Sequence, residues 1–276
     1  MPQNAVCRAR RPGMPGAAPG MPGAAPARRV TYAGPMTTPQ LPHLPMDGVE
    51  RVLCVVAHPD DMEYGASAAV AAWTAAGVEV RYLLLTHGEA GISTVDPAVT
   101  GPMRAREQQA ACDVVGVSGL TVLDHPDGVL EPGLELRRSI AAEIRRRRPQ
   151  LVLTMNWAEE APWGLNQTDH RAAGLSCLDA IRDADNPWVF RDLMDDGLAP
   201  WKVGALLVGG HPDPTHGVDV TGEPLRRGIA SLEAHAEYLA ALPWHPVPSE
   251  FIPGMTAQGG AVLGVEHAML FRRYEL

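Results

Sequence analysis

The chain has 276 residues and a formal net charge of −9. This length suffices for one large α/β domain with a substantial core, and the acidic balance argues against a general nucleic-acid binder, which needs a basic surface. Since no uninterrupted apolar run approaches the roughly 18 to 20 residues of a membrane helix, we expect no membrane span.

The N-terminal segment 1–46 is rich in Pro, Gly, Ala and Arg, and it contains GMPGAAP twice in succession. Such a composition cannot offset the entropy of ordering, so we expect a disordered tail or an artefact of start-site choice. It has no signal-peptide hydrophobic region. We therefore expect one folded domain over residues 47–276.

Arg51 to Ala57 is mostly apolar and predicts a buried parallel strand that stops at His58. His58, Asp60 and Asp61 then lie in a polar turn before the small-residue run 65–77, which predicts a helix packed closely on a sheet. Open α/β folds bind ligands at this edge of the sheet, and a histidine with carboxylates suits a divalent metal. The alternative is a capped βα turn, in which an Asp caps the helix and His58 only packs.

Alternating strands and helices continue to the end of the chain. We expect strands over 78–86, 119–123, 150–155, 203–208 and 218–221, helices over 103–115, 134–147 and 224–242, a small-residue helix that ends at Asp183, and a strand-like segment over 261–272. This order predicts a Rossmann-like three-layer α/β sandwich with a mostly parallel sheet. A nucleotide-binding site is excluded at the first turn, because no G-x-G-x-x-G follows the first strand.

Charged and sulfur-containing residues suggest core or surface roles elsewhere. Cys54, Cys112 and Cys177 lie inside apolar periodic segments without a C-x-x-C pair, which predicts small core residues rather than ligands or disulfide partners. That usage is typical of a reducing cytoplasm. The basic run Arg145 to Arg148 is interpreted as the solvated end of a helix, favoured by the helix dipole.

The AHPDD sequence after the first strand resembles the first motif of the PIG-L or LmbE-like zinc deacetylases, which remove N-acetyl groups from glucosamine-containing substrates. The resemblance runs in order from Arg51 to the C-terminus. It implies that residues 47–276 form a single LmbE-like catalytic domain.

The resemblance also implies the metal ligands. In this family a His-x-Asp-His element supplies the third ligand, so His58, Asp61 and His170 would hold Zn²⁺, although this ligand set also accepts other divalent ions. Asp60 would take a proton from water and deliver it to the departing amine. Asp169 would orient a histidine or favour the start of its helix.

One position departs from the family motif. The His-x-Asp-His element usually begins with a histidine that helps to polarise the substrate carbonyl, and this chain has Gln167 there. A glutamine N–H can donate a hydrogen bond to a developing oxyanion, but it cannot protonate a leaving amine. The acid role then falls to Asp60 or to a histidine from elsewhere.

Three further motif residues are implied to contact substrate, each with a structural alternative. Glu89 would hold a cation or a sugar hydroxyl, or merely order its loop. Arg104 would bind substrate, or form an i,i+3 surface ion pair with Glu107. Asp127 would contact sugar hydroxyls, or serve a structural Pro-Asp-Gly turn.

Two loops should border this site. The segment 92–102 is polar and is expected to form a loop over it. The loop 156–168 carries Trp157 and Trp163, whose indoles would form the wall of a sugar pocket or anchor the loop to the core. We assign Trp163 to substrate binding.

These features predict a metal-dependent hydrolase that removes an N-acyl group, in the first place N-acetyl, from a small molecule containing an amino sugar. Two alternatives remain open. The first is a metal-retaining sugar-binding module without turnover, motivated by Gln167. The second is an amidase of a larger mycothiol-like or glycopeptide conjugate. A homo-oligomer is compatible with the sequence, and no nucleic-acid partner is expected.

Overall fold

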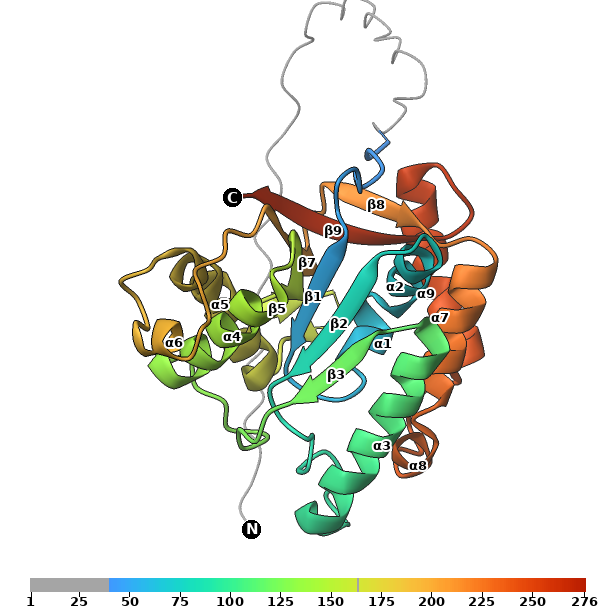
Figure 1. Cartoon of the computed structure of the whole chain (residues 1–276). Coiled ribbons are helices and arrows are strands. Elements are labelled where there is room, and N and C mark those ends of the chain that lie inside the picture. The colour runs from blue at the N-terminus through green and yellow to red at the C-terminus, as the bar shows by residue number, and fades with distance from the viewer. Residues whose placement is uncertain (1–39, 163) are drawn as a thin grey trace, which may run out of the picture. The chain divides into compact units, whose positions relative to one another are not determined.

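A seven-stranded sheet lies at the centre of the described chain, with strand order β3-β2-β1-β4-β7-β9-β8 (Figure 1). The structure is a computed structural model that describes residues 40–162 and 164–276. The strands of this sheet are β1 (Arg51–Val56), β2 (Glu79–Leu84), β3 (Gly119–Val122), β4 (Leu151–Met155), β7 (Ala205–Gly209), β8 (His216–Asp219) and β9 (Ala268–Glu275). A separate two-stranded hairpin consists of β5 (Glu160–Ala161) and β6 (Gly164–Leu165).

Most of the sheet is parallel. Strands β1, β2, β3, β4 and β7 pair in parallel, and β9 runs antiparallel to both β7 and β8. All five residues of Val52–Val56 are buried, as expected for a strand covered on both faces. The predicted α/β sandwich with a mostly parallel sheet is therefore confirmed.

Helices cover both faces of the sheet. They are α1 (Asp61–Gly65), α2 (Ser67–Ala75), α3 (Pro97–Val115), α4 (Leu134–Arg147), α5 (Thr168–Asp185), α6 (Asp192–Asp195), α7 (Glu223–Glu233), α8 (Ala236–Ala240) and α9 (Pro248–Leu263). Figure 1 shows α4 and α5 on one side of the sheet, and α2, α3, α7 and α9 on the other. Each side has its own hydrophobic core. None of the described helices combines the length and the apolar character that crossing a membrane requires.

The folded region begins before the predicted boundary at residue 47. Leu44 is 7% exposed and belongs to the core, and its N–H donates to the Gly217 carbonyl at 2.8 Å. The Leu41 N–H donates to the Val262 carbonyl at 3.2 Å. The expected tail is therefore wrong for residues 41–46, whereas residues 1–39 lie outside the described residues.

The helix α3 begins earlier than expected. The segment 92–102 was predicted as a loop, yet its second half is helical from Pro97 onward. Asp96 caps this helix by accepting a hydrogen bond from the Ala98 N–H at 2.9 Å, and Pro97 occupies the first turn, where its missing N–H costs nothing.

Three other boundaries also differ. The expected helix 65–77 begins at Ser67 as α2, because Ala66, with a φ of −158°, separates it from the short helix α1, which already begins at Asp61 in the expected polar turn. The expected helix 224–242 is divided at Ala234 and His235 into α7 and α8. The strand expected over 261–272 begins at Ala268, because α9 occupies 248–263.

Small residues allow two helices to approach their neighbours closely. A Cβ added at Gly228 in α7 would lie 2.8 Å from the Cβ of Ala68 in α2. A Cβ added at Gly174 in α5 would lie 2.5 Å from the Met155 carbonyl oxygen at the end of β4. The close approach of Gly174 to Met155 places the first half of α5 directly against the end of β4.

Arg145 is buried, with 1% exposure, so the prediction of a solvated basic run is wrong at this position. Its guanidinium donates to five carbonyl oxygens, those of Asp183, Ala184, Asn186, Val189 and Phe190, at 2.9 to 3.2 Å. The last carbonyls of a helix lack partners within the helix, and Arg145 supplies them for the end of α5.

Replacing Arg145 by Met should therefore lower the free energy of unfolding by at least ~3 kcal/mol, because five carbonyls lose a charged donor at once. Urea unfolding measures the loss. The matched control is Arg146→Met on the same helix, whose side chain is 44% exposed and which should cost less than ~1 kcal/mol. Equal losses in the two variants would contradict the assignment.

Candidate metal and catalytic site

The candidate site forms where β1 and β4 end side by side. These strands are parallel neighbours, so the segments that follow them meet at the same edge of the sheet. His58 and Asp61 lie in the turn after β1, and Asp61 is the first residue of α1. His170 lies in the first turn of α5, which follows β4 after a loop.

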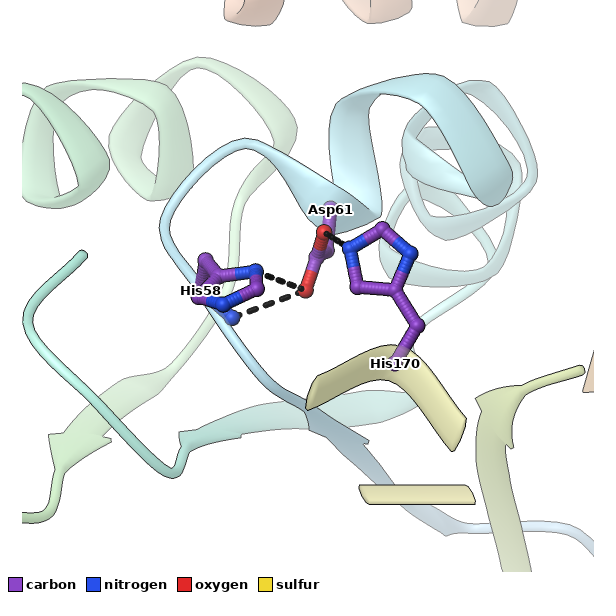
Figure 2. Close-up of side chains that lie close together, drawn as sticks. All are labelled: His58, Asp61 and His170. Carbon is purple, nitrogen blue, oxygen red and sulfur yellow. Dashed lines mark hydrogen bonds and ion pairs between the residues drawn. The ribbon is translucent and has the colours of Figure 1, made fainter. Parts of the chain in front are cut away.

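The Asp61 carboxylate lies between the two imidazoles (Figure 2). Its Oδ1 is 3.1 Å from His170 Nε2, and its Oδ2 is 3.6 Å from His58 Nδ1. The Oδ2 atom also accepts the His58 backbone N–H at 2.8 Å. The three predicted metal ligands therefore lie together, with one atom from each within 4.8 Å of the others.

These separations fit a metal ion. A tetrahedral cation with bonds of 2.0 to 2.2 Å holds its ligand atoms about 3.4 Å apart, and the atoms that these three residues offer lie within 4.8 Å of one another, so small side-chain movements would bring them onto one ion. Two nitrogens and one oxygen are also a donor set that catalytic divalent sites use. The structure thus contains a possible His/Asp metal site.

Two further carboxylates contact His58 on the other side of its ring. Asp127 Oδ1 lies 3.0 Å from Nε2, and Asp169 Oδ2 lies 3.3 Å from it. Asp169 is fully buried and also accepts the backbone N–H groups of Gly128 at 2.7 Å and Leu130 at 3.0 Å. Acceptors at Nε2 favour a proton there, which leaves Nδ1, on the Asp61 side of the ring, as the nitrogen that would bind a metal.

The electrostatics favour a cation at the site. Burial lowers the pKa of His58, but the Asp61 carboxylate and the contacts with Asp127 and Asp169 raise it well above its usual value. Burial raises the pKa of Asp61, but His170 and His58 together hold it below its usual range. Three carboxylates around two imidazoles leave an excess of negative charge that a divalent ion would neutralise.

Asp60 is 7% exposed and has a φ of 83°, a left-handed backbone conformation that residues other than glycine seldom adopt. Its N–H donates to Gln108 Oε1 at 2.9 Å, and its Oδ1 accepts from Arg104 Nη2 at 3.0 Å. Burial raises the pKa of Asp60 to about 6, although Arg104 opposes the shift. This value suits a group that exchanges protons near neutral pH.

Arg104 is 2% exposed, and its guanidinium donates to the carbonyls of Gly88 at 3.0 Å and Pro59 at 2.5 Å, in addition to Asp60. The alternative of an i,i+3 ion pair with Glu107 is wrong, because the Glu107 carboxylate accepts backbone N–H groups of α8 instead. Contact between Arg104 and a substrate stays a prediction.

Glu89 and Asp127 tie together the loops that follow β2 and β3. Glu89 Oε1 accepts the Asp127 N–H at 2.9 Å, and Asp127 Oδ2 accepts the Ala90 N–H at 2.7 Å. Both side chains thus order their loops, and Asp127 also reaches His58. Their expected contacts with sugar hydroxyls stay predictions.

Gln167 is exposed and forms the N-cap of α5. Its Oε1 accepts the backbone N–H groups of Asp169 at 3.0 Å and His170 at 3.3 Å. Because these donors need an acceptor, the amide nitrogen is directed away from the helix end. Gln167 therefore stabilises the turn that carries two of the site residues.

The predictions for the two tryptophans of the loop after β4 fare differently, because the structure describes only one of them. Trp157 packs against the core between the sheet and helices α4 and α5, so it anchors the loop. Trp163 lies outside the described residues, and its assignment to substrate binding stays a prediction.

Several residues beside Asp60 were not predicted from the sequence. Gln108 lies one helical turn after Arg104, and this i,i+4 spacing was a usable signal. The Tyr64 hydroxyl is 2.6 Å from His245 Nε2, and the fully buried His235 has its Nε2 3.6 Å from Glu63 Oε2. Those partners lie far apart in the chain, and no local pattern indicated them.

A separate hollow of about 380 Å³ lies beside the first half of α3. It is lined by Ile92, Val95, Ala98, Val99, Pro102, Met103, Arg106, Glu237 and Ala241. None of the three metal-ligand candidates borders it, nor does Asp60. This mainly aliphatic hollow is therefore separate from the His/Asp cluster.

Comparison with known proteins finds a de-N-acetylase family model and several deacetylases that are similar to this chain. Residues 53–181 match the family model PIG-L, described as GlcNAc-PI de-N-acetylase. The chain is 32% identical over 183 residues to a diacetylchitobiose deacetylase of Thermococcus kodakarensis, covering 64% of this chain and 66% of that protein. It is 28% identical over 249 residues to a 1D-myo-inositol 2-acetamido-2-deoxy-alpha-D-glucopyranoside deacetylase of Kineococcus radiotolerans, covering 75% and 62%. The chain thus spans just under two thirds of either relative.

The fold also matches a solved structure. The N,N'-diacetylchitobiose deacetylase from Pyrococcus horikoshii superposes with a TM-score of 0.76 at 22% identity, over 84% of this chain and 86% of that one. At this level of identity the similarity concerns the fold.

Proposed function

Because the chain belongs to the PIG-L, or LmbE-like, family, we propose that it is a metal-dependent hydrolase that removes the N-acetyl group from a small molecule containing an amino sugar. The observation that carries this proposal is the convergence of His58, Asp61 and His170, with the carboxylate of Asp60 in the same turn. Its relatives act on acetamido sugars, which supports the substrate class.

We propose Zn²⁺ as the metal, held by His58, Asp61 and His170. With three protein ligands, positions on the ion stay open for water and substrate. A bound zinc ion would polarise the amide carbonyl and lower the pKa of water. Iron or manganese would suit the same donor set, so metal analysis of the purified protein decides between them.

The residues of the chain supply the proton transfers and the orientation. Asp60 takes a proton from water as the water oxygen adds to the amide carbon, and it returns that proton to the nitrogen as the C–N bond breaks. The Gln167 amide N–H donates a hydrogen bond to the carbonyl oxygen as negative charge develops there. Glu89, Asp127 and Trp163 contact the sugar.

Two alternatives remain distinguishable by experiment. A sugar-binding module without turnover would retain metal but release no amine, and the glutamine at position 167 motivates it. An amidase would require a larger mycothiol-like or glycopeptide conjugate.

The three described cysteines are free and buried, which supports our expectation of a reducing, cytoplasmic environment.

The test uses the purified full chain. Bound metals are measured, and amine release is followed with N,N'-diacetylchitobiose, N-acetylglucosaminyl-inositol and a glycopeptide bearing an N-acylated amino sugar. Amine from the first two supports the deacetylase. Bound metal without amine from any of the three favours the binding module, and amine from the glycopeptide alone favours the amidase.

Replacing Gln167 by His should raise kcat about tenfold or more, because an imidazole at this position can donate a proton as well as a hydrogen bond. The matched control is Gln167→Asn, which keeps an amide and a good N-cap but adds no proton donor, so kcat should not rise above that of the wild type. Steady-state amine release measures both. Unchanged kcat in the His variant would show that this position does not take part in proton transfer.

A further inference from the structure

We propose that Arg104 is a positioning residue that holds Asp60 in its working conformation, and that α8 completes this arrangement by placing Tyr238 on the guanidinium. The inference rests on the proposed function and assigns a role to a helix outside the segment 53–181 that the family model matches. It replaces direct sugar binding as the role of Arg104.

Three polar residues on one face of α3 carry the arrangement. Arg104, Glu107 and Gln108 have the i, i+3 and i+4 spacing that brings side chains together on a helix. Their exposures are 2%, 7% and 1%, so this polar face is buried inside the protein. Buried polar groups need partners, and these side chains find theirs in the turn after β1 and in α8.

The turn after β1 is held through Asp60, whose backbone N–H and side-chain carboxylate each bond to a residue of α3. Gln108 Oε1 accepts the Asp60 N–H, and Arg104 Nη2 donates to the Asp60 carboxylate. Arg104 also donates to the Pro59 carbonyl. Asp60 has a left-handed φ of 83°, which is uncommon for any residue other than glycine, and these contacts stabilise it in that conformation.

The guanidinium is enclosed on the side of the loop after β2. Gly88 accepts a hydrogen bond from Nη1, and Gly91 lies so close that an added Cβ would be 2.5 Å from the same atom. The two glycines of this loop therefore leave room for the side chain of Arg104. Because Arg104 is only 2% exposed, a sugar hydroxyl could reach its guanidinium only if the surrounding groups moved.

Helix α8 closes the remaining side. The Arg104 guanidinium carbon lies 3.8 Å from the centre of the Tyr238 ring, a cation–π contact. Glu107 fixes this helix, since its carboxylate accepts the backbone N–H groups of Glu237 at 2.5 Å and Tyr238 at 3.3 Å. One face of α3 thus connects α8 to the catalytic turn.

The two roles for Arg104 predict different kinetics. A residue that binds the sugar equally in ground and transition states changes KM when it is weakened, whereas a residue that orients the catalytic carboxylate changes kcat. A lysine at position 104 keeps the positive charge but cannot reach three acceptors from one planar group. Arg104→Lys therefore tests position rather than charge.

The experiment uses the metal-loaded full chain with N,N'-diacetylchitobiose as the probe. We expect Arg104→Lys to lower kcat about 10- to 100-fold, with KM changed less than about twofold, because misplacement of a catalytic group has costs of this size. Tyr238→Leu should lower kcat in the same way, and Tyr238→Phe, which keeps the ring, should recover most of it. The control Arg106→Lys alters an exposed arginine of α3 that bonds only to Pro102 among the described contacts.

A crystal structure of Arg104→Lys gives a readout that does not depend on turnover. We expect the Asp60 carboxylate to leave its present direction, while bound metal and circular dichroism stay as in the wild type. A raised KM with unchanged kcat, or an Asp60 that keeps its φ near 83° and its direction, overturns the proposal. Absence of amine release by the wild type refutes only the proposed function, because the crystal structure still decides the role of Arg104.

Discussion

His170→Ala is expected to lose the bound divalent metal and, with it, deacetylation. The Asp61 carboxylate lies between His170 and His58, so removing one imidazole leaves two of the three ligands (Figure 2). Loss of an outer partner of a ligand already weakens metal binding about 10- to 100-fold, so loss of a ligand itself should exceed about 100-fold. Metal stoichiometry after dialysis and titration against a chelator measure the change.

Two companion variants make this result specific. Asp169→Asn leaves all three ligands in place but weakens the contact at His58 Nε2, so an intermediate loss of about 10- to 100-fold in metal affinity is expected. His43→Ala removes an exposed imidazole, while the backbone β-bridge between residue 43 and Gly217 on β8 stays in place. This variant should bind metal like the wild type. Full stoichiometry in His170→Ala would refute the ligand assignment.

The parts of the fold that follow from local sequence were predicted well. The helix expected over 134–147 has those bounds in the structure, because Gly133 and the left-handed Arg148 flank a segment with clear periodicity. The strand that ends before His58 was also predicted, since a continuous apolar run marks a strand buried on both faces. Strand ends then indicated where the polar residues would gather.

Errors arose where a local signal was given too little weight. The polar composition of 92–102 suggested a loop, but Asp96 followed by Pro97 is a helix start that could have been read from the sequence. For Arg145 the misleading feature was its place in a basic run. Whether a charged side chain at a helix end meets water or buried carbonyls depends on which segment packs there.

The surroundings of the site depend on contacts across the chain. The resemblance to a family pointed to His58, Asp61 and His170, and strand-edge geometry explains their meeting. No pattern near Arg104 could reveal that Tyr238, more than a hundred residues later, would lie on its guanidinium. Such pairings follow from the packing of whole helices, which sequence periodicity alone does not specify.

Asp60→Asn should lower kcat about 100- to 10,000-fold while the metal content stays unchanged, because the variant removes the proton acceptor without removing a proposed ligand. Asparagine has nearly the same shape, and its side-chain oxygen can still accept from Arg104. Amine release and metal analysis on the same preparations separate loss of the base from loss of the ion. Unchanged release of amine by this variant would remove Asp60 as the base.

The pH dependence gives this assignment a second measurement. Burial raises the pKa of Asp60 to about 6, and the base must be ionised to accept a proton, so kcat/KM should rise as the pH increases through this value and level off above it. A bound cation favours the ionised carboxylate and would move the rising limb to lower pH. Since asparagine does not titrate, the residual activity of Asp60→Asn should lack this limb. A limb of the same midpoint in both proteins would assign it to another group, and the general-base role of Asp60 would then have no support from the pH profile.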